Sequence, residues 1–136
     1  MMEGEITPNI LDSGNISRVR FYACPTCGNI LFSTGSASIF CCGRGLEAIE
    51  PLETTDVIKM IVEEMDTDYF ITFDHPMTKE HYISFVAYVK TDRVFFKRLY
   101  PEQSPTCRFP QTQGGKLYVY CVEHGLAVHR GWLPVQ

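Results

Sequence analysis

The chain has 136 residues, of which 45% are hydrophobic, and a formal net charge of −4 at pH 7. This length supports one good hydrophobic core with room for a small metal-stapled module, and the acidic balance argues against a nucleic-acid partner. No stretch reaches the roughly 18 apolar residues of a membrane span, and the acidic first residues do not resemble a secretory signal, so we expect a cytoplasmic protein without a membrane partner.

Residues 1–16 contain turn formers without sustained periodicity, so we expect a flexible leader and assign it no function. Residues 17–50 alternate short apolar segments with turn residues. A segment this short and this rich in turns cannot bury enough surface to fold through its own core. We therefore expect residues 17–50 to form a small domain that a bound metal holds together.

Residues 51–136 have longer apolar segments, rich in β-branched and aromatic side chains and separated by turn formers. The expected strands are 57–65, 69–73, 81–90, 93–99, 107–109, 117–122 and 126–132. Short strands at this spacing are typical of a β-sandwich, so the whole chain is predicted to be all-β. The segment 57–65 is ambiguous, because its apolar side chains would also line one face of a helix.

Four cysteines in the first region, Cys24, Cys27, Cys41 and Cys42, predict a metal site. Reduced cytoplasmic thiols in a Cys-x-x-Cys pair, with a second pair nearby, favour a metal over structural disulfides. Four thiolates suit iron or zinc, and the sequence does not choose between them. A purely structural zinc knuckle is the main alternative. A thioredoxin-like exchange pair is a weaker one, because no βαβ pattern surrounds the cysteines.

A second group of metal-ligand residues lies in the expected sandwich. His75 and His81 flank a short loop, and Cys121 and His124 lie where one expected strand ends and the next begins. A single histidine at such a position is more often an ordinary surface residue. Two such pairs in one domain nevertheless predict that they meet at one edge of the sandwich.

Three motifs occur in order along the chain: Tyr-x-Cys-Pro-x-Cys-Gly-Asn-Ile with a later Cys-Cys-Gly, then His-Pro-Met-x-x-Glu-His-Tyr-Ile, then Cys-x-x-His-Gly-Leu. This ordered set resembles the desulfoferrodoxin family of superoxide reductases over about residues 20–132. The resemblance implies a desulforedoxin-like four-cysteine domain over 17–50 and an immunoglobulin-like sandwich over 51–136. It also implies two metal centres, whose ligands are Cys24, Cys27, Cys41 and Cys42 at the first and His75, His81, Cys121 and His124 at the second.

By the same resemblance, iron is the expected metal at both centres, with zinc as the alternative at each. The family reduces superoxide to hydrogen peroxide with electrons from a donor such as rubredoxin, which implies a role in oxidative stress, and it commonly forms homodimers. However, the family's catalytic iron has four histidines, and the remaining one belongs to a Glu-Lys-His motif that this chain lacks. The expected position falls near Val57 or Ile58, and Asp56 offers only a carboxylate.

Lys79, inside the loop between the two histidines, is the candidate for attracting an anion in place of the missing lysine. His129 is expected at the surface, and Cys107 is expected to be a small buried residue. The incomplete ligand set also supports a rival function, a non-catalytic or metal-sensing protein with a structural four-cysteine site. A zinc-ribbon interaction domain is a third possibility, and the sequence leaves the electron donor and the oligomeric state open.

Overall fold

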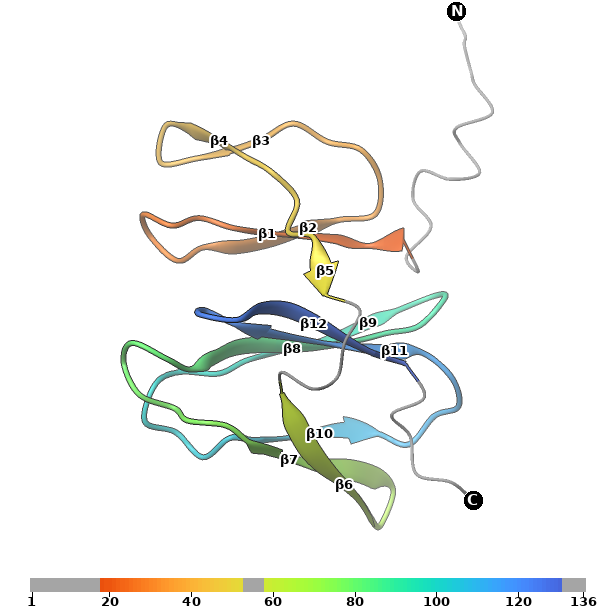
Figure 1. Ribbon diagram of the computed structural model, residues 1–136. Helices are drawn as coiled ribbons and strands as arrows, with labels where there is room; N and C mark the ends of the chain where they lie inside the picture. Colours follow the sequence, from red (N-terminus) through yellow and green to blue (C-terminus); the bar gives the residue numbers. More distant parts are fainter. Residues whose placement is uncertain (1–17, 53–57, 131–136) are drawn as a thin grey trace, which may run out of the picture. The chain divides into compact units, whose positions relative to one another are not determined.

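The computed structural model describes residues 18–52 and 58–130. The chain divides into two compact units, Met1–Glu50 and Pro51–Gln136, and each is described by itself. The described residues form β-strands joined by turns and loops (Figure 1), so the prediction of an all-β protein is confirmed. The predicted leader, Asp56 and Val57 lie outside the described residues.

The described part of the first unit, residues 18–50, consists of two antiparallel hairpins. Strand β1 (Arg20–Ala23) pairs with β2 (Ile30–Ser33), and β3 (Ile39–Cys41) pairs with β4 (Arg44–Leu46). Few side chains here are fully enclosed, and Phe21, which is 1% exposed, is the largest of them. A unit with so small a core needs a further source of stability.

The turn between β3 and β4 has an unusual sequence for its geometry. Cys41 pairs with Arg44, so Cys42 and Gly43 form a two-residue turn. Both residues have positive φ angles, 56° at Cys42 and 77° at Gly43, which is the pattern of a type I′ turn. Such turns favour Asn-Gly, because both residues must adopt a positive φ. A cysteine at the first position lacks this backbone preference, so its presence indicates a function of its thiol.

The described residues of the second unit, 51–52 and 58–130, form two sheets. A three-stranded sheet has the order β10-β7-β6, and a five-stranded sheet has the order β5-β12-β11-β8-β9. The strands are β5 (Pro51–Leu52), β6 (Lys59–Met65), β7 (Asp68–Asp74), β8 (Ile83–Val89), β9 (Val94–Arg98), β10 (Thr106–Pro110), β11 (Lys116–Cys121) and β12 (Gly125–Arg130). The parallel pairing of the short β5 with β12 was not predicted.

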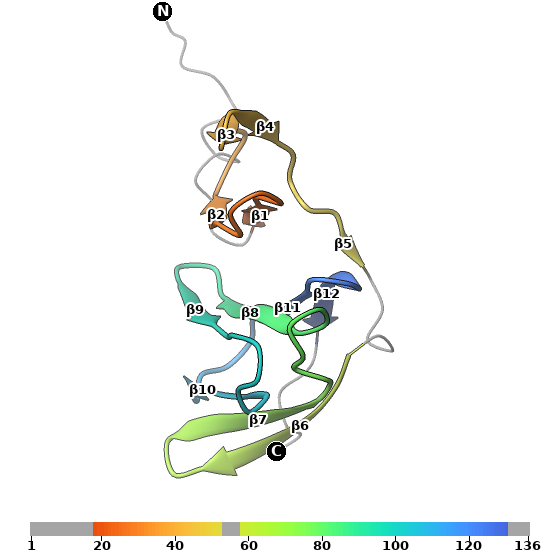
Figure 2. The same cartoon turned by 90° about the vertical axis from the view of Figure 1, so that its left-hand side faces the viewer.

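The core of this unit lies between the two sheets, which Figure 2 shows as two layers. Strand β7 alternates between partly exposed and buried residues, and it turns Ile71 and Phe73 inward. Phe109 from the smaller sheet meets Tyr88 from the larger one, with ring centroids 5.8 Å apart. Aromatic and aliphatic contacts of this kind give the second unit a core of its own, independent of any ligand.

The ambiguous segment 57–65 is an edge strand from Lys59 onward. Strand β6 pairs with β7 along its whole length, and Asp66 and Thr67 form the turn between them. Met60 and Val62 pack against the core on one face, as strand alternation requires, while Ile61 is 65% exposed on the other. Pairing with β7 decides the conformation that the apolar pattern left open.

The expectation of a surface position for His129 is wrong, because this residue is only 3% exposed. Strand β12 is buried on both faces, because Leu126, Ala127 and Val128 are buried as well, so alternation leaves no exposed face for His129. Cys107 is buried, as expected, at 5% exposure. Among the residues that the structure describes, no helix is long and apolar enough to cross a membrane.

Candidate metal centres

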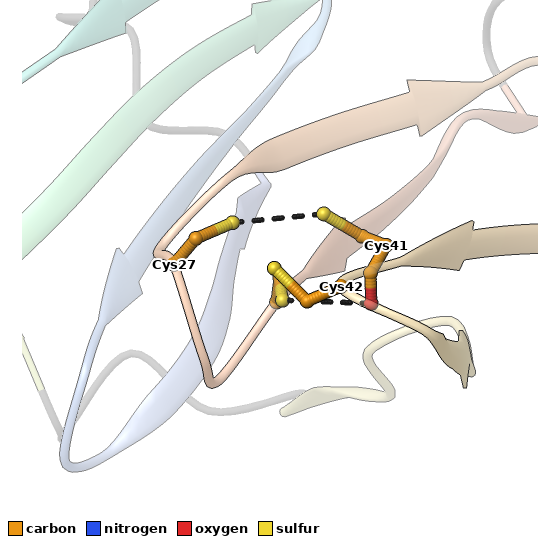
Figure 3. Close-up of side chains that lie close together, drawn as sticks. Cys27, Cys41 and Cys42 are labelled. Atoms are coloured by element: carbon orange, nitrogen blue, oxygen red, sulfur yellow. Dashed lines mark hydrogen bonds between the residues drawn. The ribbon is translucent and has the colours of Figure 1, made fainter.

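The first candidate centre joins the turns of the two hairpins in the first unit. Cys24 and Cys27 lie in the loop between β1 and β2, Cys41 ends β3, and Cys42 opens the turn to β4. Their four sulfur atoms lie within 4.8 Å of one another. Figure 3 shows the Cys27 and Cys41 side chains facing each other, with the two sulfur atoms 3.6 Å apart.

The backbone of the first loop is folded tightly around this cluster. The amide of Gly28 donates to the carbonyl of Cys24 at 2.9 Å, and the amide of Cys24 donates to the carbonyl of Asn29 at 2.9 Å. Gly28 has a φ of 76°, which lets the chain turn back at this point. The side-chain amide of Asn29 approaches the Cys41 sulfur at 3.7 Å. Backbone and side chain thus hold the thiols together.

The four thiols cannot all ionise easily without a cation among them. A hydrogen bond from the backbone of Cys27 is the main cause that lowers the pKa of Cys24 to about 6. Hydrogen bonds with the Cys27 and Cys24 thiols raise the pKa of Cys42 to about 12. The first thiolate of the cluster therefore forms near neutral pH. Ionisation of a further thiol is unfavourable, because the two negative charges would repel each other. A metal ion removes this repulsion, because thiolates are its ligands.

The second candidate centre lies at one end of the sandwich. His75 follows the end of β7, His81 precedes β8, Cys121 ends β11, and His124 lies in the turn before β12. Strand β7 belongs to the smaller sheet and the other strands to the larger one, so the residues come from both layers. Their ligand atoms lie within 4.8 Å of one another, which brings the two sequence pairs together.

The three imidazole rings of this cluster stand nearly perpendicular to one another, at 83° to 85°. The centroid of His81 lies 4.7 Å from that of His75 and 4.7 Å from that of His124. The centroids of His75 and His124 are farther apart, at 5.7 Å. His81 is therefore the middle ring of the three.

Two of these rings present a free nitrogen. The Nε2 atoms of His75 and His81 are buried and have no hydrogen-bond partner among the described residues. His75 Nδ1 lies 2.7 Å from the carbonyl oxygen of Pro76, so this nitrogen carries the proton and Nε2 keeps its lone pair. Burial lowers the pKa of His75 and keeps the ring neutral, as a ligand must be. A buried unpaired nitrogen of this kind fits a metal ligand.

The sulfur of Cys121 is fully buried and accepts two backbone hydrogen bonds. The amides of Glu123 and His124 each donate to it at 3.4 Å. Such donors stabilise a thiolate and fix its direction. The Cys-x-x-His spacing therefore has two roles. The turn that it forms brings His124 to the cluster, and the same turn supplies the amides that bind the Cys121 sulfur.

The loop between the two histidines closes on itself. Thr78 and His81 exchange backbone hydrogen bonds of 3.0 and 3.3 Å, and the Thr78 hydroxyl accepts a further bond from the His81 amide at 3.1 Å. Lys79 lies exposed in this turn. The contribution of Thr78 was not predicted, although a threonine three residues before a ligand is the signal that would have indicated it.

No further His, Cys, Asp or Glu among the described residues joins the second cluster. Ile58, one of the two positions where a fourth histidine was expected, is fully buried and belongs to the same core cluster as Cys121. Its side chain has no donor atom. The structure therefore assembles three imidazoles and one thiol in the part of the chain that it describes.

The curated proteins that this chain resembles in sequence are named desulfoferrodoxin or desulfoferrodoxin homolog. A desulfoferrodoxin of Desulfarculus baarsii is 28% identical over 119 residues, which cover 79% of this chain and 93% of that protein. A desulfoferrodoxin homolog of Archaeoglobus fulgidus is also 28% identical, over 118 residues, which cover 79% and 94%. A desulfoferrodoxin of Clostridium acetobutylicum is 38% identical over 53 residues, which cover 39% and 42%. No family model matches the chain.

Among solved structures, the superoxide reductase from Treponema pallidum superimposes with a TM-score of 0.70 and 24% sequence identity. The match covers 82% of this chain and 98% of that one, and it establishes a common fold. The resemblance seen in the sequence motifs is thus confirmed: the chain has homologues named desulfoferrodoxin, shares the fold of a superoxide reductase, and carries both clusters of potential metal ligands.

Proposed function

We propose that this chain is an iron-binding redox protein of the desulfoferrodoxin type that reduces superoxide to hydrogen peroxide. The observation that carries the proposal is the second cluster, in which His75, His81, Cys121 and His124 bring their ligand atoms within 4.8 Å of one another. Imidazole and thiolate together are a donor set for iron or zinc. The curated names and the fold of the superoxide reductase favour iron at this centre.

At the first centre the four cysteines would hold iron, or zinc, through their thiolates. Two of the cysteines, Cys27 and Cys42, are exposed, so the centre is accessible to an electron donor such as rubredoxin. The dimer that the resemblance implies and the cytoplasmic location expected from the sequence are parts of the same proposal.

At the second centre His75, His81, Cys121 and His124 would hold an iron, which would supply the one electron that, together with two protons, reduces superoxide to hydrogen peroxide. The protein's own residues prepare this chemistry. Because Nδ1 of His75 carries the proton, Nε2 keeps a lone pair that can bind a metal. The amides of Glu123 and His124 donate hydrogen bonds to the Cys121 sulfur and so stabilise its negative charge. Lys79, exposed in the adjoining loop, would add a positive field for the incoming anion.

One observation favours a second function. Buried Ile58 occupies a position where a ligand was expected, and the chain has no histidine between Cys42 and His75. A centre with fewer imidazoles has a different potential and geometry. The alternative is therefore a protein whose first site is structural and whose second site binds metal without catalysis, as a sensor.

The deciding experiment is rapid mixing of the reduced, iron-loaded protein with superoxide, with peroxide measured as the product. Superoxide reductase activity predicts fast oxidation of the second centre and one peroxide per electron, without release of oxygen. The matched control is Cys121→Ser, which keeps the size of the side chain but removes the thiolate. A wild-type rate no higher than that of this variant or of free iron would reject catalysis in favour of the sensing function.

A further inference from the structure

We infer that the edge strand β6 is a contact surface for a second copy of this chain, with the two β6 strands pairing antiparallel about a two-fold axis at Ile61. The proposed function includes a dimer but assigns it no surface. The pairing inferred here depends on β6 alone and not on a metal ion. It joins the sheet β10-β7-β6 of one copy to the same sheet of the other.

Strand β6 (Lys59–Met65) presents an edge that can accept another strand. Among the described strands it pairs with β7 alone, over seven consecutive residues and without a register shift. The edge strands β5 and β10 each contain a proline, Pro51 and Pro110, which lacks the amide that a further strand needs. Strand β6 has neither a proline nor a bulge, the usual protections of a sheet edge.

The backbone of β6 turns the amides and carbonyls of Met60 and Val62 toward this edge. The hydrogen bonds of a central antiparallel strand alternate between its two neighbours. The amide of Phe73 in β7 donates to the carbonyl of Pro105 at 2.8 Å, on the side of β10, so the residues on either side of Phe73 bond to β6. Ile61 is paired with one of them. Its neighbours Met60 and Val62 therefore point their backbone groups away from β7.

The side chains of β6 select one register for the pairing. Outward-facing residues must oppose each other for their backbone groups to bond, so Met60 of one copy pairs with Val62 of the other. This register places Ile61 opposite Ile61 on the axis. It also places Lys59 opposite Glu63, once on each side of the axis. No other register that keeps the outward groups opposite each other brings Lys59 and Glu63 together.

The side chains that meet in this register are exposed. Ile61 is 65% exposed, and Lys59 and Glu63 are exposed on the same face. Met60 and Val62 keep their packing against the core of their own copy. Opposed residues whose backbones do not bond to each other have the closest side chains in an antiparallel pair, so the isoleucine contact lies between two ion pairs. Charges also protect edges from other strands, but here their signs are complementary between copies.

The test is sedimentation equilibrium of the full-length protein over a range of concentrations. The wild type should associate reversibly into dimers. Lys59→Glu or Glu63→Lys brings like charges together on both sides of the axis and should raise the dissociation constant about tenfold. The double variant, Lys59→Glu with Glu63→Lys, exchanges the signs and should restore the wild-type value. Lys97→Glu, the same change of charge on the edge strand β9, is the control and should have no effect.

Amide hydrogen exchange locates the contact on the chain. The amides of Met60 and Val62 should become protected as the protein concentration rises, whereas the amide of Ile61, which faces β7, should be protected at every concentration. A dimer with equal dissociation constants in all variants, or exchange at Met60 and Val62 that ignores concentration, would overturn the inference alone. A monomer at every concentration would also overturn the dimer of the proposed function. Peroxide formation in the rapid-mixing experiment tests the reaction separately.

Discussion

The two units assemble their clusters in different ways. In the first unit the four cysteines lie in the turns of two short hairpins, and Cys27 and Cys42 are exposed. In the second unit the ligands lie at the ends of long strands whose other side chains form a shared core, and Cys121 is fully buried. We therefore expect a metal at the first cluster to hold its unit together, whereas the fold of the second unit holds the second cluster in place.

This difference separates two uses of a metal ion. A unit without a sufficient core gains its folding free energy from metal binding, as small zinc modules do. A sandwich that folds through its own core can instead preorganise ligands for chemistry. The unpaired Nε2 atoms of His75 and His81 indicate preorganisation, because the fold keeps them buried without a partner among the described residues.

The largest effect is expected from metal removal at the first cluster. Chelation under reducing conditions, or Cys24→Ser, should unfold residues 18–50 and leave the sandwich folded. Metal binding to small thiolate sites contributes about 10–16 kcal/mol, far more than this unit's core can replace. Backbone amide spectra by NMR would measure the effect on each unit separately. As the matched control, Cys121→Ser should preserve the structure of both units. Simultaneous loss of both units on chelation would contradict the comparison.

A packing defect in the sandwich should act independently of metal. Gly115 has a φ of 98°, and a Cβ added there would lie 2.5 Å from Tyr88 Cε1. We expect Gly115→Ala to destabilise the second unit by about 2–4 kcal/mol through backbone strain and overpacking. Gly114→Ala is the control, because its φ is also positive, at 73°, but nothing lies within 4 Å of the added atom.

The Gly114 variant should therefore lose only about 1 kcal/mol, from the backbone alone. Denaturant unfolding of both variants, with and without metal, would measure the difference. Equal losses for the two variants would show that Tyr88 does not restrict this turn. A loss for Gly115→Ala that disappears when metal is added would show that the sandwich depends on its ligand after all.

The sequence predicted most of the strands of the second unit, because long segments with β-branched and aromatic residues carry their own signal. It missed the short β5, which depends on pairing with β12 far along the chain, and it left the expected strand 57–65 ambiguous, because only the pairing with β7 excludes a helix there. The misplacement of His129 has a different origin. Side-chain alternation distinguishes a buried face from an exposed one only when one face is solvated, and four consecutive residues of β12, 126–129, are buried.

The candidate ligands of both clusters were predicted from their motifs, and the structure brings each group together, but the interactions that orient these residues were not predicted. The hydrogen bonds from the amides of Glu123 and His124 to Cys121, and the contact between His75 and Pro76, involve backbone atoms that every residue type provides. No side-chain pattern distinguishes them. The positive φ of Cys42 is an exception, because a Cys-Gly pair between two short strands already indicates a tight turn.

A smaller effect is expected from pH, through the buried His129. Burial lowers the pKa of this residue, so the folded state binds its proton less readily than the unfolded chain. Its contribution to stability is therefore present above the unfolded pKa of about 6.5 and is lost as the pH falls below it. The slope reaches at most about 1.4 kcal/mol per pH unit for one proton.

Replacement of His129 by Leu should remove this part of the pH dependence without affecting the first unit. Unfolding free energies at several pH values between about 5 and 8 would measure it, and the other histidines cancel when variant and wild type are compared. Parallel plots of unfolding free energy against pH for the two proteins would mean that the pKa of His129 is the same in the folded and unfolded states. A steeper curve for the variant would contradict the sign of the shift.

The smallest effect is expected at Lys79, because this lysine is exposed to solvent, which screens its charge. Lys79→Ala should slow the reaction of the second centre with superoxide by about two- to threefold at low ionic strength, and the difference should vanish at high salt. Lys79→Gln keeps more of the side-chain length and should behave like alanine if charge alone matters. Rates from rapid mixing would measure this, and electron transfer into the first centre should stay unchanged. A larger loss, insensitive to salt, would mean that Lys79 holds the turn between Thr78 and His81 and acts on the ligand through the backbone.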